Sequence, residues 1–522
     1  MSFTNKSSDS QHSLWTRFLG RMASIFSEKD KDQVNTPVPV GHSGRLWVVS
    51  NRLPVTVSEK GRRVRYFPSS GGVSTGLASY FARKDSRSYV WMGWAGGKVS
   101  DERKAIVAKE LNDNHNCVPV FLGKEKMDKF YLGFCNKTIW PLFHYFPTYT
   151  EYVEENWENY KEVNGLFRDE LLRHLQPDDI LWIHDYHLML LPGMLKEKMP
   201  SARIGFFLHI PFPSSEMTRL LPGEWREEIL EGLLGSDLIG FHTERYARHF
   251  LNSVSGILGI KHTDGKIIHG KKSTTVQAFP MGVDYEHFHK LSLADEVNRQ
   301  LKEIKDRNRD QKIILSIDRL DYTKGIYHRL MGYEKFLSDN PEWRQKVVLM
   351  IIIVPSRIGV DSYRDMKKKL DEEIGRINGR FSDLNWSPIA YQYKSIRPET
   401  LVALYKAADI ALVTPLRDGM NLVAKEYLAS HPDHDGILIL SEMAGAANEL
   451  TGAIMVNPNY PKEITSAIEE ALVMPQEEQI RRNAHQYQRV KEYSVFKWAD
   501  SFLGKLTEEN DSSENTTSSQ NT

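Results

Sequence analysis

The sequence predicts an α/β protein with two doubly wound parallel sheets that face a central cleft. Short apolar runs rich in Val, Ile and Leu alternate with longer amphipathic runs, as expected of strands that alternate with covering helices. The alternation occurs in two sets, separated by a Pro- and Gly-containing stretch at residues 279–283. The length of 522 residues also exceeds what one hydrophobic core supports, so we expect two or more domains.

The first set predicts a domain over residues 44–283. Apolar runs typical of buried parallel strands lie at 46–50, 180–183, 204–208 and 238–241. Helical patterns lie at 171–175 and 226–234. Residues 58–67, which follow the first strand, are predicted to form a hairpin.

The second set predicts a domain over residues 284–485. Its strand-like runs lie at 313–317, 347–354, 410–413 and 437–440, and its helical patterns at 361–377 and 398–408. The run 347–354 is the most apolar of the chain. It is far shorter than the roughly 20 residues that a membrane-spanning helix needs, so we expect no membrane span.

Both ends of the chain are expected to be tails. Residues 1–43 are largely polar, but apolar residues recur at helical spacing over 14–26, which predicts a short amphipathic helix. That helix either docks on a membrane or a partner, or packs on the chain's own surface. The tail lacks the long apolar core of a secretory signal. Residues 507–522 are rich in Ser, Thr, Asn and Glu and are predicted to be disordered.

The composition indicates no nucleic-acid or membrane partner. The 68 Lys and Arg residues offset 68 Asp and Glu residues, so no net field attracts nucleic acid or acidic lipid. The two cysteines, Cys117 and Cys135, give neither a zinc spacing nor a disulfide framework. This usage favours a reducing compartment, and we expect the protein in the cytoplasm.

The run from Thr414 to Glu426 predicts an anion-binding loop, because the apolar strand at 410–413 leads directly into it. Asp418 and Asn421 are residue types that cap helices, and Gly419 permits a backbone turn that other residues resist. Unpaired N–H groups at such a helix start favour an anion. Glu426, about two turns further on, can accept hydrogen bonds from sugar hydroxyls, so the run suggests a nucleotide site. The alternative is an ordinary capped helix.

Three cations follow strands of the second domain. Arg319 and Lys324 come after the strand at 313–317, and Arg357 comes after the strand at 347–354. An Arg fork and a Lys point charge together can hold a diphosphate without a metal ion. Taken singly, each of the three is also explained as a surface charge or as part of an ion pair.

Strand ends of the first domain carry further candidate ligands. Arg52 follows the first strand, and the amides of Gly71 and Gly72 precede an apolar helix, so all three can contact an anion. The alternative is a Gly-rich turn beside a solvated arginine. Asp185 and His209 each follow a strand, where they either bind a sugar or fill structural roles.

Two other patterns are ambiguous. Tyr131 and Trp140 offer aromatic faces that pack either on a sugar ring or in the core. The Asp-x-Asp patterns at 30–32 and 433–435 have the form that metal-dependent sugar transferases use. Neither follows a strand, so we interpret both as coincidental and expect no metal site.

Five motifs, in this order and spacing, resemble those of the trehalose-6-phosphate synthases: Ser50-Asn51-Arg52-Leu53-Pro54, His184-Asp185-Tyr186-His187, Phe207-Leu208-His209-Ile210-Pro211-Phe212-Pro213, Asp318-Arg319-Leu320-Asp321-Tyr322-Thr323-Lys324-Gly325 and the run from Thr414 to Glu426. The resemblance covers residues 44–505. It implies a GT-B fold with two Rossmann-like domains, in which a final helix over 486–506 returns to the first domain. It also implies the reaction of UDP-glucose with glucose 6-phosphate to give α,α-trehalose 6-phosphate and UDP.

The resemblance assigns the glucose 6-phosphate site to Arg52, Tyr131, Trp140, Asp185 and Arg357. It assigns the UDP-glucose site to Gly71, Gly72, Arg319, Lys324, Ile396, Asp418, Gly419, Met420, Asn421, Leu422, Val423, Ala424, Lys425 and Glu426. The implied catalytic residues are His209, Asp418, Arg319 and Lys324.

Within the donor site, the resemblance implies that different residues bind different parts of UDP-glucose. The loop 418–421 holds glucose, and the amides of Leu422 and Val423 meet the diphosphate. The backbone of Ile396 holds uracil, Glu426 holds the ribose hydroxyls, and His209 lies near the reacting carbon.

The implied reaction retains the α configuration of the donor, yet the sequence offers no carboxylate placed as a covalent nucleophile. Front-face attack is the expected route, with the leaving phosphate accepting the proton of the acceptor hydroxyl. No cofactor is expected, because UDP-glucose is a co-substrate and Arg319 and Lys324 stand in for a metal ion.

Two other functions remain open at this point. A nucleotide-sugar epimerase can use the same fold without an acceptor, and a regulatory member of a trehalose-synthesis complex need not catalyse any reaction. The chain has no phosphatase motif, so dephosphorylation is expected elsewhere. Expected partners are a second copy of the chain, or a trehalose-phosphate phosphatase with regulatory subunits.

Overall fold

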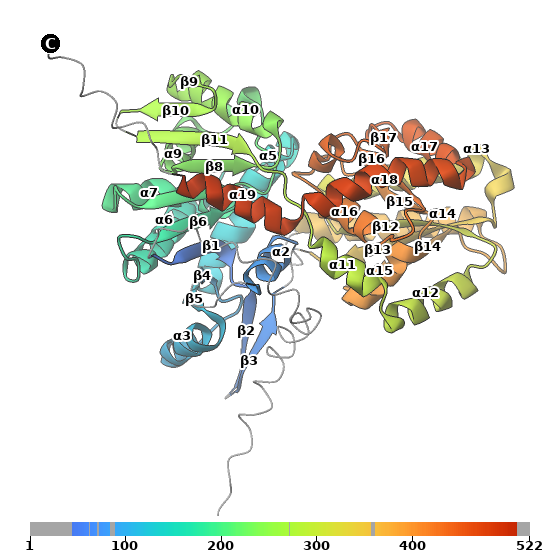
Figure 1. Cartoon of the computed structure of the whole chain (residues 1–522), viewed down its shortest axis with the longest axis horizontal. Coiled ribbons are helices and arrows are strands. Elements are labelled where there is room, and N and C mark those ends of the chain that lie inside the picture. Colours follow the sequence, from blue (N-terminus) through green and yellow to red (C-terminus); the bar gives the residue numbers. More distant parts are fainter. Residues whose placement is uncertain are drawn as a thin grey trace, which may run out of the picture.

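The computed structural model describes residues 44–508 except 62, 70–71, 84–88, 271 and 357–360. The predicted helix at 14–26, the Asp-x-Asp pattern at 30–32 and the tail beyond 508 therefore lie outside the described residues. Figure 1 shows two α/β units side by side, each built around one main sheet. Within the described ranges, no helix combines the length and apolar character needed to cross a bilayer.

The first sheet has nine strands in the order β5-β4-β1-β6-β7-β8-β11-β10-β9. All neighbours from β5 to β11 are parallel, and β10 and β9 continue the sheet with antiparallel pairs. The strand order reverses at β1, which lies between β4 and β6, and open α/β sheets bind ligands at such a point. The strands are β1 (Leu46–Arg52), β4 (Tyr89–Trp94), β5 (Cys117–Val120), β6 (Ile180–His184), β7 (Arg203–Phe207), β8 (Leu238–Phe241), β9 (His262–Thr263), β10 (Lys266–His269) and β11 (Lys272–Ala278).

The predicted hairpin is present as a separate two-stranded sheet, β2 (Val55–Lys60) and β3 (Arg63–Pro68). The helices of this half are α2 (Gly72–Phe81), α3 (Asp101–His115), α4 (Lys124–Met127), α5 (Trp140–Phe143), α6 (Glu154–Leu172), α7 (Leu191–Lys198), α8 (Ser215–Thr218), α9 (Gly223–Leu233) and α10 (Glu244–Ser253). Two π-helices, η3 (Asp128–Ile139) and η6 (Val254–Leu258), and two 3-10 helices, η4 (Pro147–Tyr149) and η5 (Tyr186–Leu188), complete it.

The second sheet has six parallel strands in the order β14-β13-β12-β15-β16-β17. They are β12 (Lys312–Arg319), β13 (Val347–Val354), β14 (Ile389–Tyr393), β15 (Ile410–Val413), β16 (Ile437–Ser441) and β17 (Ile454–Val456). The helices are α11 (Tyr285–Ser292), α12 (Asp295–Arg307), α13 (Ile326–Asp339), α14 (Asp361–Phe381), α15 (Pro398–Ala407), α16 (Leu422–Ala429), α17 (Pro461–Val473), α18 (Gln476–Glu492) and α19 (Val495–Thr507), with 3-10 turns η7 (Tyr322–Lys324), η8 (Pro341–Trp343) and η9 (Gly445–Asn448).

Both main sheets are buried on two faces, which explains why their strands are continuous apolar runs. In β1, Val49 and Val48 face opposite cores, and in β13, Ile351 and Ile352 do the same. Every strand predicted from the sequence is present. Strands β4, β5, β9, β10, β11, β14 and β17 were not predicted, because their runs are short or interrupted by polar, aromatic, Gly or Pro residues.

The expected single helix over 486–506 is wrong. The structure has two helices, because the chain leaves helical geometry at Tyr493 and restarts at Ser494, whose side chain accepts from the N–H of Lys497. Helix α18 packs against α11 and α16 of the second unit. Helix α19 packs against α2, β7 and β8 of the first unit, so the return to the first domain is made by α19 alone (Figure 1).

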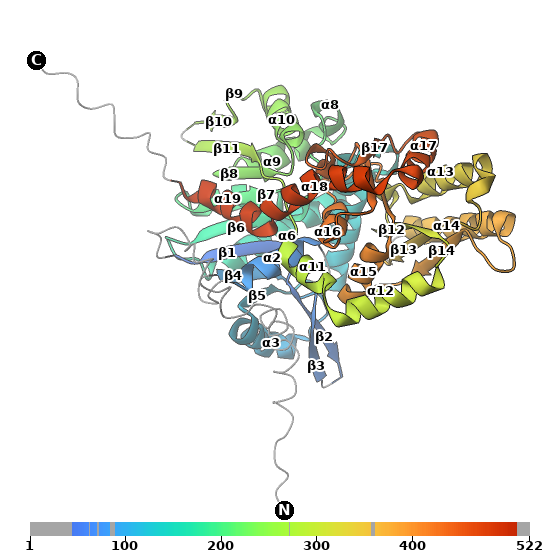
Figure 2. The ribbon, with the colours of Figure 1, turned by 45° about the vertical axis from the view of Figure 1, so that its right-hand side comes forward.

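The two passages of the chain between the units touch each other, and Figure 2 shows both near the middle of the molecule. In the first passage, Met281 packs in the core of the first unit and Val283 in that of the second. In the second passage, the N–H of Val495 donates to the carbonyl of Val283 at 3.1 Å. Only glycine fits at Gly282, since a Cβ there would lie 1.9 Å from the carbonyl oxygen of Tyr493.

Replacement of Phe502 by Ala tests how strongly α19 holds to the first sheet. Phe502 is fully buried and stacks on Trp182 with ring centroids 5.1 Å apart. We expect Phe502→Ala to lower the free energy of unfolding by about 3–5 kcal/mol, measured by urea denaturation. The exposed Lys497→Ala is the matched control and should change it by no more than about 0.5 kcal/mol. Equal effects of the two substitutions would contradict this account of α19.

Candidate active site

The carboxyl ends of the two parallel sheets meet, and this is where the predicted site residues lie. A Cβ on Gly419, after β15, would lie 2.4 Å from the carbonyl oxygen of His209, after β7. The hydroxyl of Tyr246, at the start of α10, donates to the carbonyl of Asp418 at 3.1 Å. The loops after β7 and β15 are therefore in direct contact, as ligand binding between two doubly wound units requires.

His209 belongs to a group of three imidazoles, of which His184 and His242 are buried and His209 is partly buried. Its Nε2 lies 3.0 Å from Nδ1 of His184, and its ring centroid lies 5.4 Å from that of His242. Burial lowers the pKa of His184 to about 3 and is the main cause that lowers the pKa of His242 to about 3. Burial, reinforced by the two neighbouring imidazoles, also puts the pKa of His209 well below its usual range. All three rings are therefore neutral near pH 7.

Asp185 is fixed beside His209, because β6 and β7 are neighbouring parallel strands. It has a left-handed backbone conformation with φ of 75°, and its N–H donates to the carbonyl of Phe207 at 2.8 Å. Its carboxylate accepts from the N–H of His209 at 3.3 Å. The strained backbone and these two bonds hold the carboxylate at the edge shared by β6 and β7.

Arg52 ends β1 at the switch point of the first sheet. Its Nη2 donates to Thr56 at 2.8 Å, and its guanidinium lies 5.6 Å from the centroid of the Trp94 ring. Burial lowers the pKa of Arg52. Its Nε is buried and has no acceptor within the described part of the chain, so this guanidinium retains capacity to bind an anion. Gly72 begins α2, whereas Gly71 and Arg357 lie outside the described residues.

Tyr131 and Trp140 come from the irregular segment formed by η3 and α5. Tyr131 is partly buried and stacks on His187 with centroids 5.7 Å apart. Trp140 is buried, and its ring centroid lies 4.1 Å from that of His144. Both rings belong to the first hydrophobic core, and Tyr131 is the more exposed of the two. Of the two possibilities raised from the sequence, packing on a sugar ring or packing in the core, most of the Trp140 ring therefore follows the second.

The donor loop differs from the predicted geometry at one point. The left-handed residue is Asn421, with φ of 76°, and not Gly419. Asn421 caps α16 by accepting from the N–H of Ala424 at 3.2 Å, and its side-chain amide donates to Asp418 at 3.0 Å. Glycine is needed at 419 for close approach, because His209 lies on one side and Gly445 on the other.

Lys324 and Asp418 form an ion pair across two loops, with Nζ and Oδ2 2.5 Å apart. Burial alone would raise the pKa of Asp418, but the charge and hydrogen bond of Lys324 outweigh it, and the pKa lies below its usual range. Arg319 ends β12 and is exposed; within the described ranges it forms no ion pair. The two predicted diphosphate ligands thus differ: Arg319 projects into solvent, while Lys324 already has a partner.

The remaining donor residues surround α16. Glu426 accepts from the hydroxyl of Tyr405 at 2.8 Å, and burial raises the pKa of Glu426. Ile396, Leu422 and Val423 pack against the hydrophobic core of the second unit, and Met420 is buried in that core. The side chain of Lys425 points elsewhere: its Nζ bonds the carbonyl of Met281 at 2.8 Å and Glu449 at 2.6 Å. The side chain of Lys425 therefore links α16 to the connection between the units.

Several residues of the site were not identified from the sequence. Arg417 lies next to Asp418. It could have been selected in the same way as Arg319, because it is also a cation that follows an apolar strand. Tyr145 and Tyr246 reach the donor loop from the first unit, and Tyr405 reaches Glu426 from α15. Nothing in the local sequence marks these three tyrosines, because their roles depend on contacts between distant segments.

No cluster of three or more His, Cys, Asp or Glu side chains with metal-binding geometry occurs among the residues that the structure describes. The pattern at 433–435 precedes β16 in a loop, as expected.

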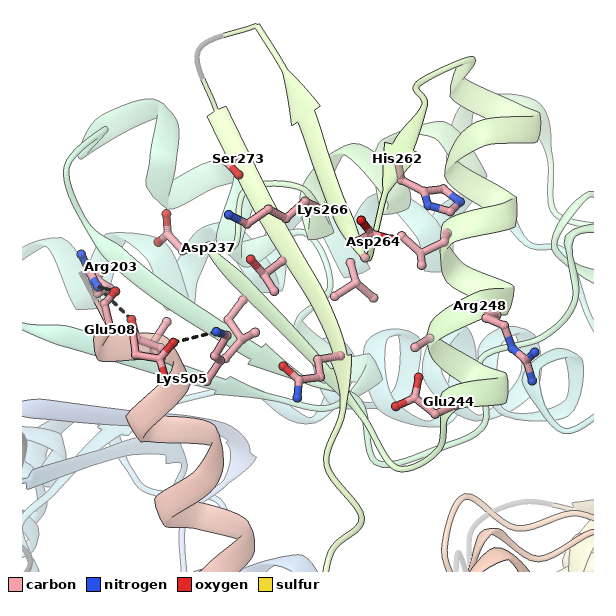
Figure 3. A pocket seen from close by; sticks show the side chains of 18 residues that line it. Arg203, Asp237, Glu244, Arg248, His262, Asp264, Lys266, Ser273, Lys505 and Glu508 are labelled. Carbon is pink, nitrogen blue, oxygen red and sulfur yellow. Dashed lines mark hydrogen bonds and ion pairs between the residues drawn. The ribbon is translucent and has the colours of Figure 1, made fainter. Parts of the chain in front are cut away.

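The cavity drawn in Figure 3, of about 1040 Å³, lies elsewhere, between α10, β11 and the end of α19. Its charged residues include Arg203, Asp237 and Lys266, and none of the predicted site residues lines it. Its basic and acidic side chains are mixed, which favours no single charge of ligand. The candidate site is therefore identified by the meeting of strand ends and not by the size of a cavity.

The buried imidazoles predict a loss of stability in acid. Unfolded histidines titrate near pH 6.5, whereas the folded pKa values are depressed, so stability is fully present above about pH 6.5 and falls as the pH drops below it. Each histidine contributes up to about 1.4 kcal/mol per pH unit in that window. We expect His184→Gln to flatten the decline of the unfolding free energy between about pH 6 and pH 4, measured by urea denaturation. His269 is exposed, and His269→Gln is the control that should leave the pH dependence of the unfolding free energy unchanged. An unchanged pH dependence in His184→Gln would contradict the conclusion that buried His184 contributes to the loss of stability in acid.

Known proteins match this chain along its whole described length. The bifunctional trehalose-6-phosphate synthase/phosphatase of Thermoproteus tenax is 45% identical over 468 residues, covering 88% of this chain and 63% of that protein. The UDP-forming α,α-trehalose-phosphate synthase of Schizosaccharomyces pombe is 42% identical and covers 89% of this chain and 91% of that protein. The chain thus spans slightly less than two thirds of the Thermoproteus relative and nearly all of the Schizosaccharomyces one.

Solved structures agree in fold. A UDP-forming α,α-trehalose-phosphate synthase from Burkholderia xenovorans, in complex with glucose-6-phosphate, has a TM-score of 0.80 at 33% identity and covers 89% of this chain and 100% of its own. An Escherichia coli protein bound with UDP-2-fluoro glucose has a TM-score of 0.78 at 33% identity, with coverages of 89% and 99%. The GT-B fold and the resemblance drawn from the five motifs are confirmed. Since the model of glycosyltransferase family 20 matches residues 44–508, the chain belongs to that family.

Proposed function

We propose that this glycosyltransferase moves glucose from UDP-glucose to glucose 6-phosphate with retention, giving α,α-trehalose 6-phosphate and UDP. The observation that carries the proposal is the contact between Gly419 and His209, which sets the anion-binding start of α16 beside the pair formed by Asp185 and His209. The relatives named as UDP-forming synthases, and the neighbours bound to glucose-6-phosphate and to a UDP-glucose analogue, support the same pair of substrates.

The acceptor side of the proposal belongs to the first unit. Arg52, together with Arg357, binds the phosphate of glucose 6-phosphate, and the unpaired Nε of Arg52 supports this role. Tyr131 and Trp140 lie beside the sugar, with the Tyr131 ring as the more accessible face. Asp185 accepts hydrogen bonds from sugar hydroxyls, because its position at the end of β6 faces the loop after β7.

The donor side belongs to the second unit. Arg319 and Lys324 bind the diphosphate, and the amides at the start of α16 add to this. In the structure Lys324 is paired with Asp418, so a bound diphosphate competes for the ammonium group and frees the carboxylate to accept from donor hydroxyls. Glu426, oriented by Tyr405, binds the ribose, and the backbone of Ile396 binds uracil.

The proposed route is front-face attack. With the donor bound, the Asp185 carboxylate accepts from the N–H of His209 and the Asp418 carboxylate accepts from donor hydroxyls, which disfavours a covalent intermediate on either. Arg319 and Lys324 stabilise the charge that develops on the leaving UDP, whose phosphate accepts the proton of the acceptor hydroxyl. His209, held neutral by burial, orients the donor sugar and transfers no proton in this scheme. In this scheme the two cations replace a divalent ion, and no cofactor takes part.

We place the enzyme in the cytoplasm, where its buried thiols Cys117 and Cys135 stay reduced. A phosphatase is the partner that consumes the product. The Thermoproteus relative is itself named as a bifunctional synthase/phosphatase, and a Kluyveromyces lactis relative is named as a 56 kDa subunit, which supports a complex with a phosphatase and regulatory subunits, or a homo-oligomer.

A coupled assay of UDP release tests the proposed reaction. We expect release from UDP-glucose only when glucose 6-phosphate is present, and no loss of rate after chelation of divalent ions. Release without the acceptor would favour an epimerase or a hydrolase, and no release at all would favour a regulatory protein. Loss of activity on chelation, restored by adding a divalent ion, would contradict the metal-free scheme.

Substitution of Gly419 tests whether the contact between the loops positions the donor. Since a Cβ at 419 would lie 2.4 Å from the His209 carbonyl, Gly419→Ala must push the donor loop away from the acceptor side. We expect kcat/KM for UDP-glucose to fall about 100-fold, the usual size of an ångström-scale misplacement. The control is Gly375→Ala in α14, where an added Cβ meets no atom within 4 Å, and it should leave kcat/KM unchanged. Full activity in Gly419→Ala would rule out the proposed geometry.

A further inference from the structure

Tyr145 has a backbone conformation that favours glycine. It follows α5 and has φ of 68°, the left-handed conformation common after a helix end, where a bulky residue is strained. Its N–H donates to the carbonyl of Leu142 at 3.0 Å. A strained tyrosine at such a position is maintained when its side chain has a task that glycine cannot perform.

The side chain of Tyr145 joins three segments of the site. Its ring lies under the guanidinium of Arg417, with the Cζ atom 3.8 Å from the ring centroid. Its hydroxyl accepts from the N–H of Ser214 at 2.8 Å, five residues beyond His209 on the same connection. Its backbone continues the segment of α5, and the preceding residue, His144, has its Nδ1 2.7 Å from the carbonyl oxygen of Trp140. The acceptor segment, the loop of His209 and the donor loop therefore meet at one residue.

A second contact joins the same segments. Tyr149 stacks on Tyr322 with centroids 5.0 Å apart at 17°, and Phe146 meets Tyr322 edge-on at 5.0 Å. The N–H groups of Leu416 and Arg417 both donate to the carbonyl of Thr323, at 2.7 and 3.3 Å.

The hydrogen bonds from Leu416 and Arg417 to Thr323 tie the loop of Tyr322 to the loop of Arg417, so the two loops move as one body. Residues 145–149, with Arg417 and Tyr322, thus form a two-point clasp between the units.

We propose that Tyr145 is a positioning residue that couples the glucose 6-phosphate site to the UDP-glucose site. Resting on the proposed transfer reaction, the coupling runs from an acceptor held near Tyr131 and Trp140, through the clasp, to Arg417 and its neighbour Asp418. An acceptor that orders the segment of Trp140 also orders the donor loop, so the first ligand favours the second. By linkage the two ligands must raise each other's affinity by the same factor.

The substitution Tyr145→Gly tests this, because glycine removes the ring while relieving the backbone strain. We expect the protein to fold, because relief of the backbone strain offsets part of the loss of the ring contacts. In the parent protein, calorimetry should show UDP binding about 5-fold or more tighter when glucose 6-phosphate is present, and Tyr145→Gly should abolish that difference. Tyr145→Phe, which keeps the ring over Arg417, should retain most of it. The exposed Tyr152→Ala is the control and should retain all of it.

Two outcomes would overturn the proposal. One is equal coupling in Tyr145→Gly and the parent, and the other is equal loss in Tyr145→Phe and Tyr145→Gly. If the parent binds neither ligand, the proposed function fails, and the clasp is then judged by urea unfolding of Tyr145→Gly, Arg417→Leu and the double variant. Shifts in the unfolding midpoint that do not add confirm the clasp, and shifts that add refute it.

Discussion

The close approach of Gly419 to the carbonyl of His209 is the contact on which the candidate site depends. It joins a loop after β7 to a loop after β15, so two sheets that share no strand present their ligand-binding edges to one another. Each loop has its own support. Asp185 holds the backbone of His209, and the segment of Ala444 and Gly445 pairs with Asp418. The separation of the two loops is thus set by backbone packing and does not rest on flexible side chains.

The cations at the strand ends of the second unit are of two kinds: one is held in a buried ion pair, and others can change partner. Arg329 is fully buried and bonds Asp318, Ser316 and Thr414, which ties the ends of β12 and β15 together. An ion pair of this kind leaves no charge for a ligand. Arg319, the next residue after Asp318, projects into solvent, and Lys324 holds only Asp418. Rigid strand ends therefore carry a few cations that can change partner, which is what the proposed diphosphate site requires.

The sequence was sufficient for the strands that are continuous apolar runs and for the residues that follow them. Strands buried on two faces appear as continuous apolar runs, and ligands of parallel sheets gather beyond the carboxyl ends, so Arg52, Asp185, His209, Arg319 and Asp418 could be selected without coordinates. The roles assigned to these residues remain proposals, while their placement at facing strand ends is what the structure describes.

Other features were not accessible because they depend on tertiary contacts. The left-handed residue of the donor loop is Asn421, and the constraint on Gly419 comes from a neighbour 210 positions earlier in the chain, at His209. The break between α18 and α19 occurs where the chain crosses over the linker at Gly282, and no local signal marks it. Tyr145 looked like an ordinary aromatic residue because its partner, Arg417, lies in the other unit.

The contact of Gly282 with Tyr493 restricts how the molecule can move. The two connections between the units touch at this point, which makes it the expected pivot for a rotation of one unit relative to the other. Lys425 bonds the linker carbonyl of Met281 from within α16, which places the donor helix directly on that pivot. A rotation about this pivot would part the loops of His209 and Gly419 without breaking either connection between the units.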